Sequence, residues 1–156
     1  MGLESYQYDP ASGEFFNRKG KKVGSYTKTY GRILHRGKEI QLSRLAFFLM
    51  EGAWPIEEVD HINGDTHNNR WNNLRKCNRV QNSQNKGKRK HNTTGYKGVY
   101  PMSYGANVYY LSKIQSNGNA YYLGSFKTPE EAAKAYNEKA LELHGEFARL
   151  NEIKGV

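Results

Sequence analysis

Four polar residues at fixed spacing carry the clearest chemistry in this sequence. Asp60 and His61 are adjacent, Asn73 follows His61 after 12 positions, and Asn82 follows it after 21. Mg²⁺ accepts carboxylate and amide oxygens as ligands, with water and phosphate completing its octahedron. An imidazole titrates near neutral pH and can take a proton from water. These groups predict metal-assisted hydrolysis of a phosphodiester, in which Asp60 and Asn82 bind the cation and His61 is the base.

Simpler interpretations of this region stay open at the level of sequence. The asparagines of residues 63–73 are also typical of turns, because their side chains bond to nearby backbone. Asn85 lies one helical turn beyond Asn82 and is an alternative ligand. His67 is in the middle of the loop, where we expect it to face solvent or phosphate. The single cysteine, Cys77, is expected to be a small core residue, and it excludes an internal disulfide or a cysteine-pair zinc site.

Short elements surround these residues. Glycines punctuate residues 1–40 and predict a meander of β-hairpins. A helix, a strand ending at His61, a polar Ω-type loop, a second strand and a short helix follow. The expected strands are Glu14–Asn17, Lys22–Lys28, Arg32–His35 and Leu74–Cys77. The first expected helix covers Leu42–Met50, with Ser43 as its cap and Gly52 as its end. The second runs from Arg79 to about Lys86, with Asn78 as its cap.

The run VDHINGDTHNNRWNNLRKCNRVQNSQN resembles the HNH endonuclease motif, in the form found in phage and intron-encoded homing endonucleases. The resemblance covers about residues 41–90 and implies a ββα-metal fold. It implies that Asp60 and Asn82 ligate a single Mg²⁺ ion, for which Mn²⁺ is expected to substitute. It further implies that His61 is the general base, that Asn73 pins the loop and orients the His61 segment, and that the products carry 5′-phosphate and 3′-hydroxyl ends.

Charge is distributed unevenly along the 156 residues, whose net charge is +9. Residues 66–129 hold 11 basic and no acidic residues, whereas residues 1–65 are balanced and residues 130–156 carry a net charge of −2. A polyanion partner explains such a stretch, because a carboxylate near a phosphate backbone weakens binding. The charge therefore predicts a nucleic acid as the partner, and the resemblance to homing endonucleases implies that it is double-stranded DNA. The expected contacts outside the C-terminal sheet are Arg70, Arg75, Lys86, Lys88, Arg89 and Lys90.

Residues 96–144 predict three strands followed by one helix. Thr128 caps that helix, Pro129 opens it and Glu131 completes a capping box, while Gly145 ends it after His144. The expected strands are Tyr96–Tyr100, Val108–Gln115 and Ala120–Lys127, and alternation places Tyr110, Ser112 and Ile114 toward the helix.

This C-terminal segment, TGYKGVY through YYLGSFKTPEEAAKAYNEKALELHGEFARLN, resembles the plant ethylene-response-factor DNA-binding domain of the Apetala family over about residues 93–151. The resemblance implies a sheet that lies in the DNA major groove with one helix behind it. The sequence departs from that family because tyrosines replace tryptophans at 110 and 122, and because Tyr100, Met102 and Ala120 replace arginines, so the plant target sequence does not transfer. The expected contacts on the sheet are Lys97, Tyr100, Lys113, Gln115 and Tyr122.

The sequence as a whole predicts an α+β protein. We expect a β-rich accessory segment at residues 1–40, an HNH ββα-metal nuclease core at 41–86, a basic linker at 87–95, and a three-stranded antiparallel sheet packed on one helix at 96–151. The predicted function is site-specific DNA cleavage by a homing endonuclease. One active site predicts that a monomer nicks one strand, while double-strand cutting would need a dimer or two events.

Two other functions stay open, a DNA-binding regulator with an inactive nuclease core and a non-specific HNH nuclease. The longest apolar run, Leu45–Met50, is far too short to span a membrane. The N-terminus lacks a basic start and an apolar stretch, so a secretory signal is not expected. The expected location is the cytoplasm of a bacterial host, with the gene carried by a phage or an intron.

Overall fold

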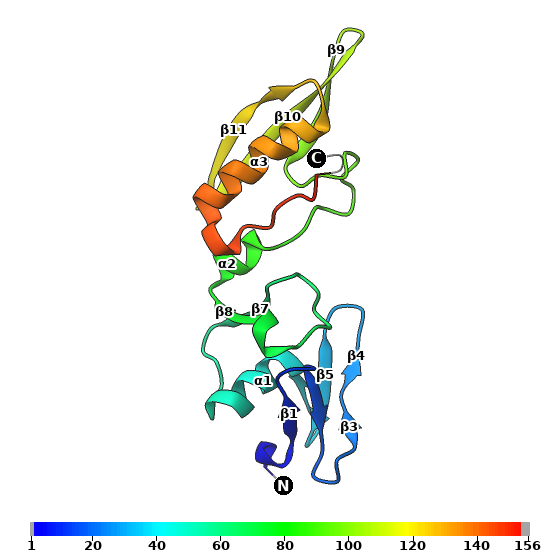
Figure 1. Ribbon diagram of the computed structural model, residues 1–156, viewed down its shortest axis with the longest axis vertical. Coiled ribbons are helices and arrows are strands. Elements are labelled where there is room, and N and C mark those ends of the chain that lie inside the picture. Colours follow the sequence, from blue (N-terminus) through cyan, green and yellow to red (C-terminus); the bar gives the residue numbers. More distant parts are fainter. Residues whose placement is uncertain (1, 154–156) are drawn as a thin grey trace. The chain divides into compact units, whose positions relative to one another are not determined.

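The computed structural model describes residues 2–153 of the chain. The chain divides into two compact units, unit 1 at residues 1–82 and unit 2 at residues 83–156. Both combine antiparallel strands with helices (Figure 1), which confirms the expected α+β class. Within the described residues, no helix is long and apolar enough to cross a membrane.

Unit 1 holds three small antiparallel sheets, with strand orders β1–β2–β3, β4–β5–β6 and β7–β8. One hydrophobic core joins them, in which Phe15 of β2 and Ile33 of β5 pack with Leu42 and Leu45 of α1. Residues 2–41 therefore build the same core as α1. The elements are η1 (Leu3–Ser5), β1 (Gln7–Asp9), β2 (Glu14–Phe16), β3 (Lys22–Val23), β4 (Ser25–Tyr26), β5 (Gly31–His35), β6 (Lys38–Gln41), α1 (Leu42–Glu51), β7 (Glu58–His61), η2 (Trp71–Asn73), β8 (Leu74–Cys77) and the first part of α2 (Arg79–Gln84), which continues past the unit boundary at residue 82.

Helix α1 forms where the apolar residues recur at helical spacing, but its start differs from the expectation. Strand β6 runs directly into the helix, so Gln41 is the N-cap and makes no side-chain cap bond. The expected cap at Ser43 is wrong, since Ser43 lies inside the helix and is buried. Gly52 ends the helix in the left-handed region at φ 75°, with its N–H donating to the Phe48 carbonyl at 2.9 Å.

Strands β7 and β8 form a hairpin that frames the polar loop of residues 62–70. Their register pairs Asp60 with Arg75 and His61 with Leu74, so the predicted strand end at His61 is confirmed. Helix α2 follows β8 with the expected cap, because the Gln81 N–H donates to Asn78 Oδ1 at 2.9 Å and the Asn78 N–H donates to Gln81 Oε1 at 2.8 Å. These elements bring strand, loop, strand and helix together around Asp60 and His61.

Unit 2 is a three-stranded antiparallel sheet, with strand order β11–β10–β9, packed on one helix, as expected. The expected first strand at Tyr96–Tyr100 is wrong in position, because the strand begins at Val99 and extends to Tyr104. Asn92 Nδ2 and the Thr94 hydroxyl donate to the backbone carbonyls of Tyr96 and Val99, which holds the preceding residues in a turn. The elements are β9 (Val99–Tyr104), β10 (Asn107–Ser116), β11 (Asn119–Phe126), α3 (Pro129–His144) and η3 (Gly145–Phe147).

Helix α3 is fixed by local signals that the structure confirms. Thr128 and Glu131 form both bonds of the capping box, with Pro129 in the first turn. Small residues on the buried face, among them Ala132 and Ala140 at 0% exposure, let the helix approach the sheet closely. Gly98 is required beneath it, since φ is +77° there and an added Cβ would lie 2.1 Å from the Tyr136 ring.

Candidate active site and DNA-contacting surface

Asp60 is a buried carboxylate held by a cross-strand ion pair. Only 6% of the residue is exposed, and its Oδ2 accepts hydrogen bonds from Arg75 Nε at 2.9 Å and Arg75 Nη2 at 2.8 Å. The pairing follows from the β7–β8 register, which places the two residues opposite each other. Arg75, expected as a DNA contact, is therefore part of the site and orients the predicted metal ligand.

Asn82 joins the acidic face of β7 from helix α2. Its Nδ2 donates to Glu58 Oε2 at 2.6 Å, and Glu58 shares a strand face with Asp60 because the two are two positions apart. Among the described residues, no hydrogen bond reaches the Asn82 side-chain oxygen. Asn85, the alternative ligand, is 5% exposed. The structure thus brings an amide group from α2 to the Glu58 carboxylate of β7.

These oxygen donors fit a hard divalent cation rather than zinc. The carboxylate of Asp60 and the amide oxygen of Asn82 are the kinds of ligand that Mg²⁺ takes, and the nearby thiol is unsuited to metal binding. Cys77 is buried in β8, as expected, and burial raises the pKa of its thiol to about 11. Within residues 2–153, His, Cys, Asp and Glu side chains form no group of three or more that could hold a metal by themselves. A cation at Asp60 and Asn82 would therefore take its remaining ligands from water and phosphate.

His61 is buried and held by a loop amide. The residue is 7% exposed, and its Nε2 lies 3.1 Å from Asn69 Oδ1. Burial lowers the pKa of His61 below its usual value, and this effect outweighs the opposite effects of the Asn69 bond and of Asp60. The imidazole is therefore neutral at neutral pH, which is the state that a general base requires.

Asn73 closes the loop between β7 and β8. Its Oδ1 accepts the Asn63 N–H at 3.0 Å, and its Nδ2 donates to Asn63 Oδ1 at 3.0 Å and to the Asn68 carbonyl at 2.8 Å. The Asn73 backbone carbonyl also accepts the Ile62 N–H at 2.8 Å. These four bonds join both ends of the loop directly after His61.

The N-terminal strands hold the same loop from outside. The Tyr8 hydroxyl donates to the Asn69 carbonyl at 2.7 Å, and the Trp71 N–H donates to the Pro10 carbonyl at 3.0 Å. His67 Nε2 lies 2.8 Å from the Thr27 carbonyl, although the residue is exposed as expected. Residues 2–30 therefore position the loop, and no sequence signal pointed to Tyr8 in that role.

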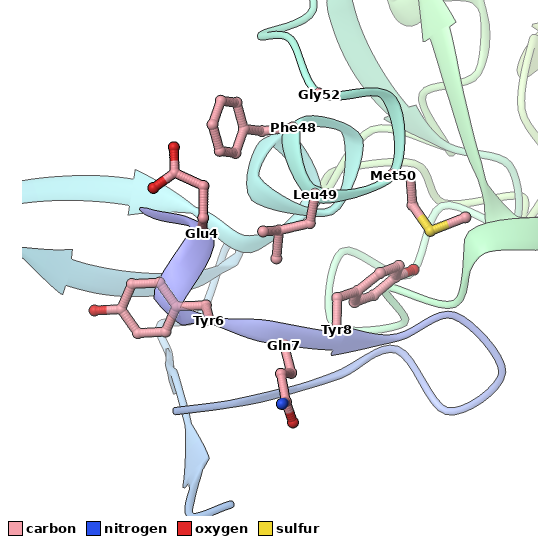
Figure 2. Close-up of a pocket in the computed structure, with 8 residues that line it drawn as sticks. All are labelled: Glu4, Tyr6, Gln7, Tyr8, Phe48, Leu49, Met50 and Gly52. Atoms are coloured by element: carbon pink, nitrogen blue, oxygen red, sulfur yellow. The ribbon is translucent and has the colours of Figure 1, made fainter. Parts of the chain in front are cut away.

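A hollow of about 480 Å³ lies between β1 and α1, and Tyr8 is among the residues that line it. Figure 2 shows Leu49 projecting from α1 toward β1, with Tyr6 and Tyr8 on either side of it. Glu4 is the only residue of its lining that carries a charge at neutral pH, and no predicted site residue is among those lining it.

Most of the basic residues expected to contact DNA are exposed. Lys88 Nζ donates to the Gly95 carbonyl at 3.1 Å. The exposed positions of this group are Arg70, which lies in the loop of residues 62–70, and Lys86, Lys88, Arg89 and Lys90, which lie in the segment after α2. These side chains can reach a phosphate backbone without giving up a buried contact.

The outer face of the unit 2 sheet carries four of the five expected contacts. Tyr100 and Lys113 touch across β9 and β10, with Lys113 Nζ 4.5 Å from the Tyr100 ring centre. Gln115 is exposed beside them, and Tyr122, opposite Lys113 on β11, is 66% exposed. An exposed tyrosine and lysine surface on a small sheet can contact both bases and phosphates.

Lys97 is not on that face, because it precedes the start of β9. Its Nζ donates to the Gln84 carbonyl at 2.6 Å and lies 6.0 Å from the Tyr136 ring centre. Burial lowers the pKa of Lys97 to about 8, with a smaller effect of Arg149 in the same direction. The structure therefore separates Lys97 from the other four expected sheet contacts.

The segment that contains the buried site is similar in sequence to known proteins. Residues 41–84 match the family model described as HNH endonuclease. A curated protein of Acanthamoeba polyphaga mimivirus, named as an uncharacterized HNH endonuclease, is 37% identical over 117 residues, which cover 74% of this chain and 59% of that protein. This chain thus spans 59% of the length of that relative. No solved structure matches. Asp60, His61, Asn73 and Asn82 all lie within the segment that matches the HNH endonuclease model.

Proposed function

We propose that this chain is a Mg²⁺-dependent DNA endonuclease that uses His61 as its general base. The observation that carries the proposal is the buried, neutral His61 beside the carboxylate of Asp60, inside a segment that matches HNH endonucleases. A neutral imidazole next to oxygen ligands provides both a proton acceptor and a cation site, the two components that phosphodiester hydrolysis needs.

Asp60 and Asn82 would hold the cation, and Mn²⁺ is expected to substitute for Mg²⁺. When bound, the cation offsets the charge that develops on the phosphate and on the leaving oxygen. Arg75 keeps the Asp60 carboxylate in place, and Glu58 does the same for the Asn82 amide through its 2.6 Å hydrogen bond. The protein thereby fixes its two ligands before DNA arrives.

His61 takes a proton from a water molecule, and the oxygen of that water forms a bond to phosphorus. The bond from phosphorus to the 3′-oxygen breaks, the leaving oxygen acquires a proton, and the products are a 5′-phosphate and a 3′-hydroxyl. Asn73 contributes by closing the loop after His61, so that the imidazole does not have to be ordered when DNA binds.

The proposed partner is double-stranded DNA, bound through the acid-free segment of residues 66–129. We assign site preference to the outer face of the unit 2 sheet, at Tyr100, Lys113, Gln115 and Tyr122, in line with the resemblance to the ethylene-response-factor domain. Exposed basic residues after α2 contact phosphates. With one active site, a monomer nicks one strand, as in a homing endonuclease of a phage or an intron.

Incubation of supercoiled plasmid DNA with the purified chain tests the proposal. We expect nicked circles in Mg²⁺ or Mn²⁺, none with a chelator, and 5′-phosphate ends at the nicks. The matched variants are His61→Ala and His91→Ala, since both remove an imidazole and only the first removes the proposed base, while His91 is exposed. Binding without cleavage across a series of divalent metals would identify a regulator instead, and equal nicking of unrelated plasmids would identify a non-specific nuclease.

A further inference from the structure

Asn69 is a buried polar residue to which neither the motif nor the proposed mechanism gives a role. It is 2% exposed, which places it among the most deeply buried side chains of the described chain. A buried amide costs free energy unless its polar atoms are bonded, so its contacts are informative. Both ends of this amide and its backbone carbonyl have partners, and one of these partners is His61.

The contacts of Asn69 determine which end of the amide faces the imidazole. Nδ2 of Asn69 donates to the His67 carbonyl at 3.4 Å, and a carbonyl can only accept. The opposite end, Oδ1, therefore faces His61 Nε2 at 3.1 Å. An amide oxygen has no proton to give, so the hydrogen in this bond belongs to Nε2.

We infer that Asn69 is a positioning residue that holds His61 in the Nε2–H tautomer, so that Nδ1 is the nitrogen that takes the proton from water. A neutral imidazole carries one hydrogen, and with that hydrogen on Nε2 the lone pair is on Nδ1. The inference rests on the proposed function for its catalytic meaning, whereas the tautomer is a property of the protein alone.

Strand β1 secures this arrangement at a distance of 61 positions along the chain. The Tyr8 hydroxyl donates to the Asn69 carbonyl at 2.7 Å, which fixes the backbone from which the amide projects. The β1–β2 turn lies against the same backbone, because a Cβ added to Gly13 would lie 2.6 Å from the Asn69 carbonyl carbon and 2.5 Å from the Arg70 nitrogen. The N-terminal strands thus act on the base through Asn69.

Long-range ¹H–¹⁵N NMR of histidine-labelled protein, without DNA or metal, reads the tautomer directly from the two ring-nitrogen shifts. His61 is assigned by comparison with His61→Gln. We expect a neutral ring with the hydrogen on Nε2 in the wild type, and a mixture of tautomers in Asn69→Leu. Asn68→Ala is the matched control, because within residues 2–153 its side-chain oxygen accepts only the Arg70 N–H, at 3.3 Å, while His61 Nε2 lies beside Asn69 Oδ1.

Cleavage kinetics add a second readout. We expect kcat to fall about 10–100-fold in Asn69→Leu with KM for DNA unchanged, a smaller loss in Tyr8→Phe, and partial rescue in Asn69→Asp, which keeps an acceptor oxygen. If Asn69→Leu does not fold, the tautomer of the wild type and the kinetics of Tyr8→Phe still test whether Asn69 positions His61. A wild-type ring with its hydrogen on Nδ1 overturns the inference. A wild type that shows the Nε2–H form but cuts no DNA overturns the proposed function and leaves the tautomer assignment standing.

A second surface is carried by a different observation, the charge of the N-terminal hairpins. Residues 15–38 contain eight basic residues and no acidic residue, although residues 1–65 are balanced as a whole. Lys22 pairs with Glu14 and Arg32 pairs with Glu39, and the other basic side chains of this segment form no ion pair with the described residues. The segment therefore presents uncompensated positive charge.

Topology gathers most of this charge at one end of unit 1. Strands β3 and β4 follow one another in the same direction (Figure 1), and β5 runs antiparallel to β4, so the β2–β3 turn and the β5–β6 turn lie at the same end. Asn17 Oδ1 accepts the Lys19 and Lys21 N–H groups at 2.9 and 3.1 Å and rigidifies the first turn. The exposed residues of the two turns are Arg18, Lys19, Lys21, Arg36 and Lys38.

We propose that this end of unit 1 contacts the phosphate backbone of DNA, a proposal that rests on the proposed function. Binding of a duplex is measured over a salt series for Lys19→Gln/Lys21→Gln and for Lys134→Gln/Lys139→Gln, which remove equal charge. The log–log salt slope is expected to become shallower by up to about 0.9 per lost contact in the first pair only. Equal slopes in both pairs overturn the proposal, while a wild type that does not bind DNA overturns the proposed function with it.

Discussion

The two regions that carry the proposed function differ in how far their polar side chains are exposed to solvent. Around His61 in unit 1, the side chains of Asp60, Asn69 and Asn73 are all less than a tenth exposed and hydrogen-bonded. On the outer face of the unit 2 sheet, Tyr104 and Tyr122 are 79% and 66% exposed.

This difference in exposure indicates how each region interacts with DNA. A buried polar group is stable only with partners, so the site in unit 1 is ordered in advance for a small reacting group. An exposed sheet leaves its side chains available to a large partner and gains their contact energy only on binding. Damage to the first region is expected to affect the reaction, and damage to the second is expected to affect recognition.

The largest effect is expected from removing a metal ligand. We expect Asp60→Asn and Asn82→Ala to lower single-turnover cleavage about 10²–10³-fold, because the cation supplies several kcal/mol to the transition state. Mg²⁺ titration of cleavage, with circular dichroism as the folding control, provides the measurement. Asn85→Ala is the matched amide variant, and if it is inactive while Asn82→Ala is active, the ligand lies one helical turn further on.

Arg75 allows a buried ion pair of unit 1 to be compared with an exposed one. Its ion pair with Asp60 is nearly buried, with the two side chains 11% and 7% exposed. Arg75→Ala leaves a buried carboxylate without this partner, and we expect the free energy of unfolding to fall by about 3–5 kcal/mol. Lys76→Ala breaks the exposed Lys76–Glu51 pair and is expected to cost about 0–1 kcal/mol. Urea denaturation distinguishes the two, and equal losses would contradict the role given to burial.

Substitutions in the unit 2 sheet and in the basic segment after α2 are expected to change DNA binding in different ways. Neutralising Lys88, Arg89 and Lys90 weakens binding to every sequence alike and reduces the salt slope by up to about 0.9 per lost contact. Lys113→Ala and Tyr122→Ala instead relax site preference by about 1–3 kcal/mol per base contact. Titration of target and scrambled duplexes over salt separates these outcomes, and full discrimination by the sheet variants would move recognition elsewhere.

The smallest expected effect concerns pH and the stability of unit 2. Burial lowers the pKa of His144 below its usual value, more than the bond to the Gln115 carbonyl raises it. The unfolded chain therefore binds a proton at His144 more readily than the folded chain does. The stability that neutral His144 contributes is fully present above its unfolded pKa of about 6.5, and it is lost as pH falls toward the lower folded pKa. Urea midpoints at pH 8 and pH 5 are expected to differ more in the wild type than in His144→Gln, whereas His91→Gln, which alters an exposed ring, leaves the difference unchanged.

Local signals predicted the parts of the fold that are decided locally. The capping boxes at Asn78 and Thr128 need only residues three positions apart, and both helices begin where expected. The first strand of unit 2 was misplaced because side chains of Asn92 and Thr94 bond to carbonyls farther along and turn the chain before Val99. That error also placed Lys97 on the wrong surface.

Residue type and spacing selected Asp60 and Asn82 as candidate ligands, and their role in metal binding stays a prediction. The structure brings the segments of these two residues together through the Asn82–Glu58 hydrogen bond, whereas the path of the loop could not be predicted. Which of the loop asparagines reaches His61 could not be predicted, because the loop is positioned by Tyr8 and Pro10, about sixty positions away. A sequence pattern contains no information about such a contact.

Cleavage rate and DNA affinity, measured side by side for His61→Ala and for the Lys113→Ala/Tyr122→Ala double variant, test the division between reaction and recognition most directly. We expect His61→Ala to lose about 10²–10⁴-fold in cleavage with unchanged affinity, because the substitution removes only the base. The double variant is predicted to lose preference for its target while its maximal cleavage rate at saturating protein stays the same. A His61→Ala chain that cuts within tenfold of the wild-type rate would contradict the assignment of His61 as the general base.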